Sequence, residues 1–352
     1  MLTEKEKQRY LRHILLDEIG EAGQLKLKQA KVLVIGAGGL GCPVLQYLAA
    51  AGVGKIGIID DDLVESSNLQ RQILFSEKNV GEPKVIAAKN RLQEMNSLIE
   101  IVAYNERLTA KNAYDLFSEY DIIVEGSDNF TTKYLTNDAA VLTEKPLVLG
   151  SIFKFDGQVS VFNYQNGPTY RCLFPEPGSA EEMPSCSEVG VLGILPGIIG
   201  NLQANEVLKI ILGIGNVLSG KLLLFDVFEM QNKILPFSKN SDVVVTELKE
   251  INFSCGTGIS ESLSYEQYKS TPENYSLLDV RTAKERAIHN IGGFHIPLPE
   301  LQKRYSELAS EDNLLVYCAS GVRSLEATSI IKAFFPEKKM HNLKGGLKAV
   351  KS

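Results

Sequence analysis

The sequence predicts an α/β protein with a doubly wound, mostly parallel sheet that carries an antiparallel extension, followed by a smaller α/β domain. Short apolar strands alternate with helices between residues 31 and 125, and a glycine-rich turn follows the first strand. A second strand–helix alternation follows a polar stretch near residue 250. We therefore expect one domain over residues 1–245, a linker over 246–260 and a second domain over 261–352, which suits a chain of 352 residues.

The alternation begins with residues 31–36 (KVLVIG), a short apolar and β-branched run that is typical of a buried parallel strand. A glycine turn, a helix and a strand that ends before Asp60 complete a βαβ unit. The further elements expected up to residue 125 are the helix 40–51, the strand 55–59, the helix 84–95, the strand 100–104, the helix 110–117 and the strand 121–125.

The pattern changes after Pro146, where residues 147–151 and 157–163 are expected to pair as strands of the extension. Residues 165–189 are rich in Pro, Gly, Ser and Glu, which is typical of a long functional or disordered loop. The apolar segment 190–212 is interrupted by glycine, proline and asparagine, so we interpret it as a buried helix rather than a membrane span.

The second domain is expected to open with a capped helix within residues 259–270 (ISESLSYEQYKS). A strand over 276–280, a strand over 314–318 and a helix over 323–335 follow. About 90 residues suffice for a small α/β domain.

Bulk properties exclude several classes of protein. The net charge of −6 offers no basic domain of the kind that nucleic-acid binders carry. The N-terminal residues are too charged for a secretory signal, and no apolar run reaches the roughly 18 residues of a membrane helix. The five cysteines form no Cys-x-x-Cys pair, and an odd number of cysteines without a signal peptide argues against a disulfide framework and favours the cytoplasm.

Residues 36–41 (GAGGLG) fit the pattern G-x-G-x-x-G between a strand and a helix, which indicates a Rossmann-like nucleotide site. The glycines of this pattern would let backbone N–H groups and a helix N-terminus meet phosphate; they are Gly36, Gly38, Gly39 and Gly41. Asp60, at the end of the next strand, could bind ribose hydroxyls. The alternative is a glycine turn that serves only helix–sheet packing.

Polar side chains follow in residues 67–72 (SNLQRQ) and in Lys84. Arg71 and Lys84 could neutralise phosphate charge, while Asn68 and Gln72 could donate neutral hydrogen bonds. A triphosphate needs such donors, whereas an NAD enzyme has no obvious need of them. The alternative is a solvated polar loop.

Asp128 lies just past the carboxyl end of an expected strand, where ligands collect in open α/β sheets. Its carboxylate is a candidate Mg²⁺ ligand, although a turn-forming Asp-Asn pair would look the same.

Together these motifs resemble the MoeB/ThiF/HesA family, relatives of the ubiquitin-activating enzymes. The resemblance covers residues 5–237 and rests on RYLR at 9–12, GAGGLG, the run Asp60–Asp62, SNLQRQ, GEPK at 81–84 and SDN at 127–129. The family adenylates the C-terminal Gly-Gly carboxylate of a ubiquitin-fold sulfur carrier and releases pyrophosphate. The resemblance implies ATP and Mg²⁺ as cofactors, with Asp60 on the ribose and Asp128 on the metal. It places Asn68, Arg71, Gln72 and Lys84 on the phosphates, and Arg12 on the ATP of the other subunit of a homodimer.

The resemblance also bears on three cysteines, Cys172, Cys186 and Cys255. Many family members hold zinc through two Cys-x-x-Cys pairs, but here Thr169 stands where the partner of Cys172 would be and Cys255 has no close partner, so we predict no zinc. Cys186 matches the family's crossover-loop cysteine and by resemblance accepts the acyl group or resolves an acyl-disulfide. A spectator cysteine is the alternative.

The second domain carries Cys318 at the end of an apolar strand, before a loop that leads into a helix. Backbone N–H groups, the helix dipole and Arg323 would favour a thiolate there, whereas a merely structural cysteine would leave the following G-x-R-S unexplained.

The segment from Cys318 to Ser324 resembles the C-x-x-G-x-R-S loop of the rhodanese domain, and residues 279–281 (DVR), 289–297 and 343–346 (LKGG) approximate its other motifs. The tryptophan usual after the last motif is absent. A phosphatase loop would place arginine at position 324, so sulfur transfer is favoured.

The two domains combine into one hypothesis: ATP activates the carrier's C-terminus, and a persulfide on Cys318 converts it to a thiocarboxylate. The expected partners are a ubiquitin-like sulfur carrier of the molybdopterin, thiamine or tRNA-thiolation pathways and a sulfur donor, either a cysteine desulfurase or thiosulfate. The alternatives are an NAD-dependent oxidoreductase and a non-catalytic carrier-docking module.

Overall fold

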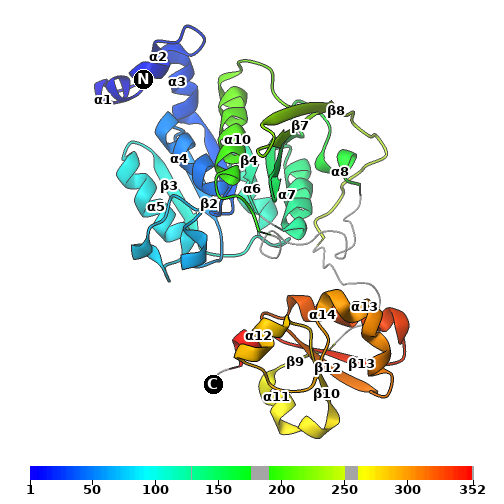
Figure 1. Cartoon of the computed structure of the whole chain (residues 1–352). Helices are drawn as coiled ribbons and strands as arrows, with labels where there is room; N and C mark the ends of the chain where they lie inside the picture. The colour runs from blue at the N-terminus through cyan, green and yellow to red at the C-terminus, as the bar shows by residue number, and fades with distance from the viewer. Residues whose placement is uncertain (128, 176–189, 250–260, 351–352) are drawn as a thin grey trace. The chain divides into compact units, whose positions relative to one another are not determined.

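The computed structural model describes residues 1–127, 129–175, 190–249 and 261–350, and these fall into two compact units (Figure 1). The first unit contains an eight-stranded sheet in the order β3-β2-β1-β4-β5-β6-β7-β8. Strands β1 to β5 run parallel, whereas β5 to β8 pair antiparallel. The predicted parallel sheet with an antiparallel extension is therefore confirmed.

The elements that the sequence predicts up to residue 162 lie close to their expected bounds, whereas α3, α7, α8, β7 and β8 were not predicted. The strands are β1 (Lys31–Ile35), β2 (Lys55–Ile59), β3 (Glu100–Tyr104), β4 (Ile122–Glu125), β5 (Leu147–Phe153), β6 (Asp156–Phe162), β7 (Lys221–Asp226) and β8 (Gln231–Pro236). The helices are α1 (Glu4–Arg9), α2 (Leu11–Ile14), α3 (Gly20–Gln29), α4 (Gly41–Ala51), α5 (Lys84–Met95), α6 (Ala113–Ser118), α7 (Phe130–Leu142), α8 (Tyr170–Leu173) and α10 (Leu195–Leu212).

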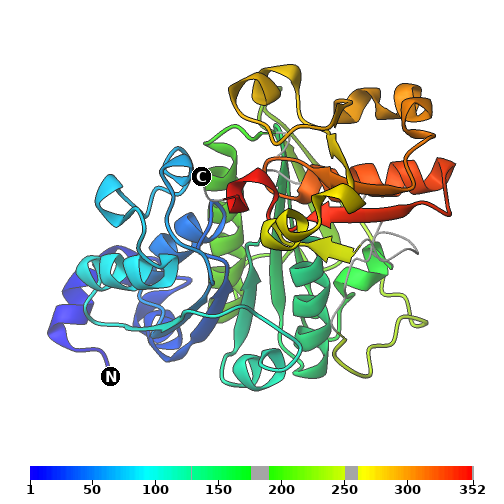
Figure 2. The ribbon, with the colours of Figure 1, turned by 90° about the horizontal axis from the view of Figure 1, so that it is seen from below.

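Helices cover both faces of the sheet, as Figures 1 and 2 show. One apolar core joins Val32 and Val34 of β1 to α4, α5 and α10, and the other joins Leu33 and Ile35 of the same strand to α6 and α7. Side chains of a strand alternate between its faces, so a strand that is apolar throughout can fill both cores. This explains why KVLVI reads as a continuous apolar run.

Within the apolar segment 190–212, residues 195–212 form the 18-residue helix α10, which packs against α4 and the sheet. Among the described residues, no helix is long and apolar enough to cross a membrane. The prediction that the segment 190–212 contains a packed helix rather than a membrane span is therefore correct.

The second unit contains a five-stranded parallel sheet in the order β11-β10-β12-β13-β9. Its strands are β9 (Glu261–Leu263), β10 (Ser276–Asp279), β11 (Phe294–His295), β12 (Asn313–Tyr317) and β13 (Lys339–Leu343), and its helices are α11 (Tyr265–Ser270), α12 (Ala283–Ile288), α13 (Leu301–Arg304) and α14 (Val322–Phe334). The opening segment differs from the expected capped helix, because residues 261–263 pair with β13 before Ser264 caps α11. The linker expected over 246–260 stays a prediction, since residues 250–260 lie outside the described part.

Candidate functional site

The turn between β1 and α4 can exist only with glycine at two of its positions. Gly36 has a φ of +88°, in the left-handed region that side chains disfavour. A Cβ on Gly41 would lie 1.9 Å from the carbonyl oxygen of Gly36. Helix α4 then begins without a side-chain cap, so the positive end of its dipole faces the turn. This is the geometry that accepts a phosphate group.

Asp60 ties the end of β2 to that turn. Its Oδ2 accepts a hydrogen bond from the backbone N–H of Ala37 at 2.7 Å, and its Oδ1 accepts one from Asp62 at 2.9 Å. Burial raises the pKa of Asp60, while the positive charge of Lys84 and these N–H groups oppose the rise. The carboxylate thus occupies the place from which an acid binds ribose in dinucleotide folds.

The structure brings two of the predicted phosphate ligands against the glycine turn. A Cβ on Gly39 would lie 3.6 Å from Cδ of Arg71, and one on Gly38 would lie 3.9 Å from Nε2 of Gln72. Gln72 is 3% exposed, and its Oε1 has no hydrogen-bond partner among the described residues. This oxygen can accept a hydrogen bond from a ligand or from water, whereas contact with a phosphate would use the Nε2 donor of the same amide.

Lys84, the first residue of α5, is 5% exposed and donates from Nζ to Oδ2 of Asp62 at 2.7 Å. The carboxylate oxygens of Asp60, Asp61 and Asp62 lie within 4.8 Å of one another. A lysine among carboxylates can exchange its partner for a phosphate without leaving a buried charge unpaired, since Asp62 is 68% exposed.

The remaining predicted residues of this site have different surroundings. Asn68 is buried and its Oδ1 accepts the N–H of Glu65 at 3.0 Å, so this side chain supports the local turn and only its amide NH₂ is left for a ligand. Arg12 lies exposed on α2. Asp128 and Cys186 lie outside the described residues.

Sequence reasoning missed a buried ion pair beside the glycine turn. Nζ of Lys133 lies 2.8 Å from Oε2 of Glu125, and the two side chains are 4% and 0% exposed. Glu125 is the last residue of a predicted apolar strand, and Lys133 falls in a stretch for which the sequence predicted no element, so no motif pointed to either residue.

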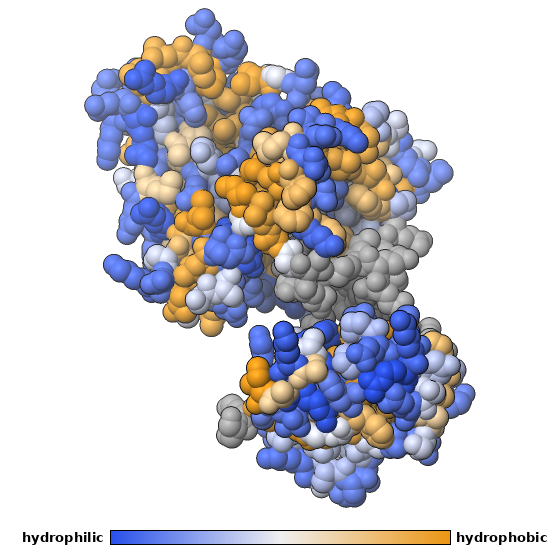
Figure 3. Space-filling view, viewed as in Figure 1, coloured by the Kyte–Doolittle hydropathy of each residue, from blue (hydrophilic) through white to orange (hydrophobic). Residues whose placement is uncertain are grey.

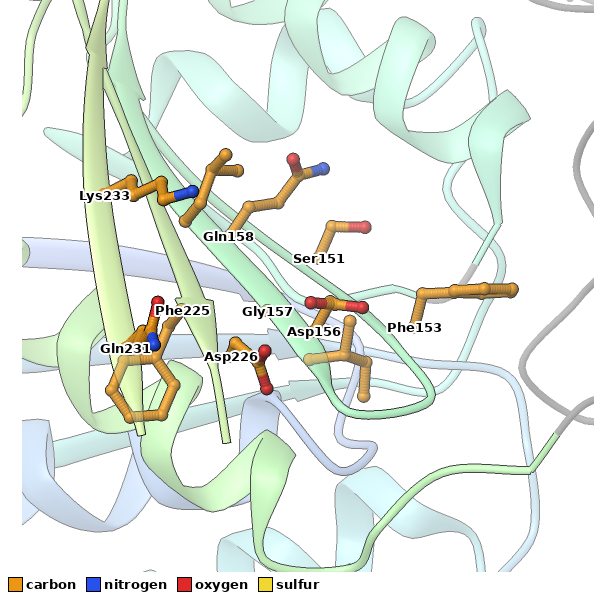
Figure 4. Close-up of a pocket in the computed structure, with 11 residues that line it drawn as sticks. Ser151, Phe153, Asp156, Gly157, Gln158, Phe225, Asp226, Gln231 and Lys233 are labelled. Carbon is orange, nitrogen blue, oxygen red and sulfur yellow. The ribbon is translucent and has the colours of Figure 1, made fainter. Parts of the chain in front are cut away.

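A pocket of about 430 Å³ lies beside the antiparallel strands (Figure 4). Charged and polar side chains of β6, β7 and β8 line it, among them Asp156, Gln158, Asp226 and Lys233. In Figure 3 hydrophobic residues gather on the visible face of this first unit, while that of the second is mostly hydrophilic. Strand β8 is exposed along its whole length.

Cys318 follows β12 directly and is fully buried. Its Sγ accepts the N–H of Gly321 at 3.1 Å, and the hydroxyl of Ser324 lies 3.4 Å away. Gly321 has a φ of +96°, and a Cβ on Gly346 would lie 2.6 Å from the carbonyl oxygen of Cys318. The loop is therefore tightly packed, presents the N–H of Gly321 to the sulfur and leads into the first turn of α14, as expected of an anion-binding cysteine loop.

Arg323 forms a two-point ion pair with Glu285 of α12, with N–O distances of 2.6 and 3.0 Å. This pairing lowers the pKa of Glu285 to about 2, so the carboxylate is ionised at neutral pH. The positive charge expected to favour a Cys318 thiolate is thus shared with a carboxylate that the sequence did not reveal.

Cys172 is surrounded by hydrogen-bond donors of the described residues. The backbone N–H groups of Thr169 and Asn240 donate to its Sγ, each at 3.4 Å. Burial would raise the pKa of Cys172, but these hydrogen bonds and the charge of Lys239 lower it overall. The prediction that no zinc is bound stays a prediction, because Cys255 and Cys186 lie outside the described residues.

Comparisons with known proteins agree with this arrangement of a nucleotide-type fold and a cysteine-loop domain. Residues 10–245 match the model of the ThiF family, and residues 264–352 match that of the rhodanese-like domain. The chain therefore belongs to the ThiF family and carries a C-terminal rhodanese-like domain.

Relatives at high identity bear the names of enzymes. The sulfur carrier protein adenylyltransferase of Thermus thermophilus is 51% identical over 68% of this chain and 90% of its own length. The adenylyltransferase and sulfurtransferase MOCS3 of Culex quinquefasciatus is 41% identical over 99% of this chain and 88% of its own. The probable adenylyltransferase/sulfurtransferase MoeZ of Mycobacterium tuberculosis is 40% identical over 99% and 93%.

Among solved structures, the fold resembles that of Escherichia coli MccB in its crystal structure with AMPCPP and MccA. The TM-score is 0.56, and the identity is 25% over 63% of this chain and 68% of that one.

The relatives named above show that the chain is an adenylyltransferase with a sulfurtransferase domain. Adenylyltransferases of this family use ATP.

Proposed function

We propose that this enzyme adenylates the C-terminal Gly-Gly carboxylate of a ubiquitin-like sulfur carrier and then converts it to a thiocarboxylate. The observation that carries the proposal is the joining, in one chain, of a glycine turn faced by Arg71 and Gln72 to a backbone cradle around Cys318. The names of relatives that match 99% of this chain support the same pairing of activities.

In the first step a carboxylate oxygen of the carrier attacks the α-phosphorus of ATP. The new oxygen–phosphorus bond forms as the bond to pyrophosphate breaks, and no general base is needed because the carboxylate is ionised at neutral pH. Arg71, Lys84 and the N-terminus of α4 would offset the charge on the phosphates. Asp128 is our candidate ligand for Mg²⁺, which would neutralise further phosphate charge.

In the second step the outer sulfur of a Cys318 persulfide attacks the acyl carbon and displaces AMP, which leaves an acyl-disulfide. A second thiol then attacks the Cys318 sulfur, so that the carrier leaves as a thiocarboxylate and a disulfide remains on Cys318. Cys186 is our candidate for this thiol, with an external reductant as the alternative. The N–H of Gly321 would stabilise the sulfur anions.

The experiment that tests the proposal incubates the enzyme with ATP, Mg²⁺, thiosulfate and a purified carrier that ends in Gly-Gly. We expect mass spectrometry to show the replacement of one carboxylate oxygen by sulfur, with AMP and pyrophosphate released. An enzyme that binds NAD and shows no carrier-dependent ATP–pyrophosphate exchange would contradict the proposal and favour an oxidoreductase. A carrier that binds without AMP formation would favour a docking module.

The pocket beside β5 to β8 is our candidate for part of the carrier's docking surface. It is concave, and Asp226 and Lys233 offer both signs of charge to a protein partner. A carrier that co-purifies with the enzyme would identify the pathway.

Because Cys42, Cys172 and Cys318 are free thiols, we also propose that the enzyme works in a reducing compartment, the cytoplasm.

We further propose a homodimer in which Arg12 completes the other subunit's ATP site. Around Arg12 on α2 and the following turn, Leu11, Leu15 and Leu16 are 46%, 63% and 50% exposed. Neighbouring exposed leucines are typical of a surface that a protein partner covers.

Mixing two inactive variants tests this arrangement. Arg12→Ala and Lys84→Met, refolded together, should recover up to about a quarter of wild-type ATP–pyrophosphate exchange, because half of the dimers are hybrids with one intact site. The same variants assayed separately should stay inactive. A mixture that is as inactive as its components, although hybrid dimers form, would rule out Arg12 acting across subunits.

A further inference from the structure

The strand β4 ends in a carboxylate that is completely shielded from solvent. Glu125 is 0% exposed, and the ammonium group of Lys133, in the first turn of α7, lies against it at 2.8 Å. Lys133 also donates to the carbonyl oxygens of Ser127 at 3.1 Å and Gly150 at 3.2 Å. Its three N–H donors therefore match three acceptors.

The pair holds the chain just after β4 through both backbone groups of one residue, Ser127. Oε1 of Glu125 accepts the N–H of Ser127 at 2.8 Å, while Lys133 binds the carbonyl oxygen of the same residue. Both backbone groups of Ser127 are thus fixed by the two partners of one ion pair.

The segment held in this way lies against the glycine turn. The N–H of Gly126 donates to the carbonyl oxygen of Ile35 at 2.9 Å, and a Cβ on Gly36 would lie 3.1 Å from the carbonyl oxygen of Gly126. A Cβ on Gly126 would in turn lie 3.3 Å from the backbone nitrogen of Gly41, the first residue of α4. A shift of residues 126–127 would therefore displace the turn that faces the phosphates.

Stability alone gives little reason for this pair. Removing two charges from water costs several kcal/mol per ion, and apolar residues of similar volume often replace a buried ion pair without loss of stability. A fixed geometry of residues 126–127 is what apolar side chains could not provide, because they donate and accept no hydrogen bonds.

We propose that the Glu125–Lys133 pair is a positioning device for the nucleotide: it holds residues 126 and 127 against the Gly36–Gly41 turn in the conformation that binds ATP. Neither side chain needs to touch the nucleotide. The inference rests on the proposed function only in taking ATP as the ligand.

The test compares ATP binding in variants whose stability is also measured. Lys133→Met alone leaves Glu125 as an unpaired buried charge and endangers folding. The double variant Glu125→Leu/Lys133→Met removes both charges and the hydrogen bonds of the pair. Glu125→Gln/Lys133→Met also removes both charges but keeps an amide oxygen that can accept the N–H of Ser127. We expect the Kd for Mg-ATP, measured by calorimetry, to rise roughly tenfold in the first double variant and less in the second.

The matched control is the ion pair between Asp138, also on α7, and Arg171 of α8. Its N–O distances are 2.7 and 2.8 Å, and its side chains are 6% and 20% exposed. Asp138→Leu/Arg171→Met should shift Tm by a similar amount yet leave the Kd for Mg-ATP unchanged.

Two outcomes would overturn the proposal: a Kd within about twofold of the wild-type value in both test variants, or an equal rise of Kd in the control at equal Tm. Failure of the proposed function looks different. In that case the wild-type enzyme would bind ATP without carrier-dependent pyrophosphate exchange, and the comparison of Kd values would still decide the role of the pair.

Discussion

Replacing Lys84 with methionine is expected to lower the rate of carrier-dependent ATP–pyrophosphate exchange by about 10²–10³-fold. Lys84 is a nearly buried cation at the start of α5, beside the acidic run that follows β2. A donor that is fixed before the reaction and shielded from water stabilises phosphate charge more than a mobile surface lysine does. Exchange of labelled pyrophosphate into ATP measures this step without the sulfur chemistry.

The variant should fold, because the partner that it leaves behind is Asp62, a carboxylate that is 68% exposed and can be hydrated. Lys89→Met makes the same change five residues further along α5 and should exchange pyrophosphate at the wild-type rate. Sulfur transfer from thiosulfate to cyanide should continue in Lys84→Met. Pyrophosphate exchange by Lys84→Met at the wild-type rate would show that Lys84 does not act on the phosphates of ATP.

Replacing Cys318 with alanine is expected to abolish sulfur transfer and to leave pyrophosphate exchange intact, the reverse of the effect of Lys84→Met. Thiocarboxylate formation should fall on the order of 10³-fold or more, because the atom that carries the transferred sulfur is gone. Pyrophosphate exchange should persist, since the Cys318 loop belongs to the other compact unit. Mass spectrometry of the carrier measures the first quantity.

Cys172→Ala provides the matched control for this cysteine. Cys172 is a free thiol in the first unit, and hydrogen bonds lower its pKa. Among the described residues it is therefore an alternative nucleophile to Cys318. We expect thiocarboxylate formation by Cys172→Ala to equal that of the wild type. Wild-type yield from Cys318→Ala would show that sulfur reaches the carrier by another route.

Much of the fold follows from local pattern. Strands such as KVLVI are recognisable because both faces of the parallel sheet are covered, which requires apolar residues throughout. The short strand β9 escaped prediction, because its three residues form a strand only through pairing with β13, far along the chain. Such non-local pairing leaves no signal in a three-residue window.

The site divides in the same way. The glycine turn, Arg71, Gln72 and Lys84 stand in compact motifs that point to a nucleotide, and the structure brings them to the ends of β1 and β2. Glu125–Lys133 and Glu285–Arg323 join residues on separate elements, so their pairing depends on tertiary contacts. The loop sequence shows the positive charge of Arg323, but it does not show that Glu285 of α12 pairs with that charge.

The complete burial of Cys318 also bears on the chemical durability of the enzyme. A reactive thiol is vulnerable to peroxide, and oxidation beyond the sulfenic acid is generally irreversible. The backbone of Gly346 packs so tightly against the backbone of the cysteine loop that even a methyl group would collide with it. Because Cys318 is 0% exposed, its resting sulfur is shielded from oxidants in bulk solvent. We therefore expect a sulfur donor to reach it only after the loop has moved, which makes that movement a candidate rate limit for turnover.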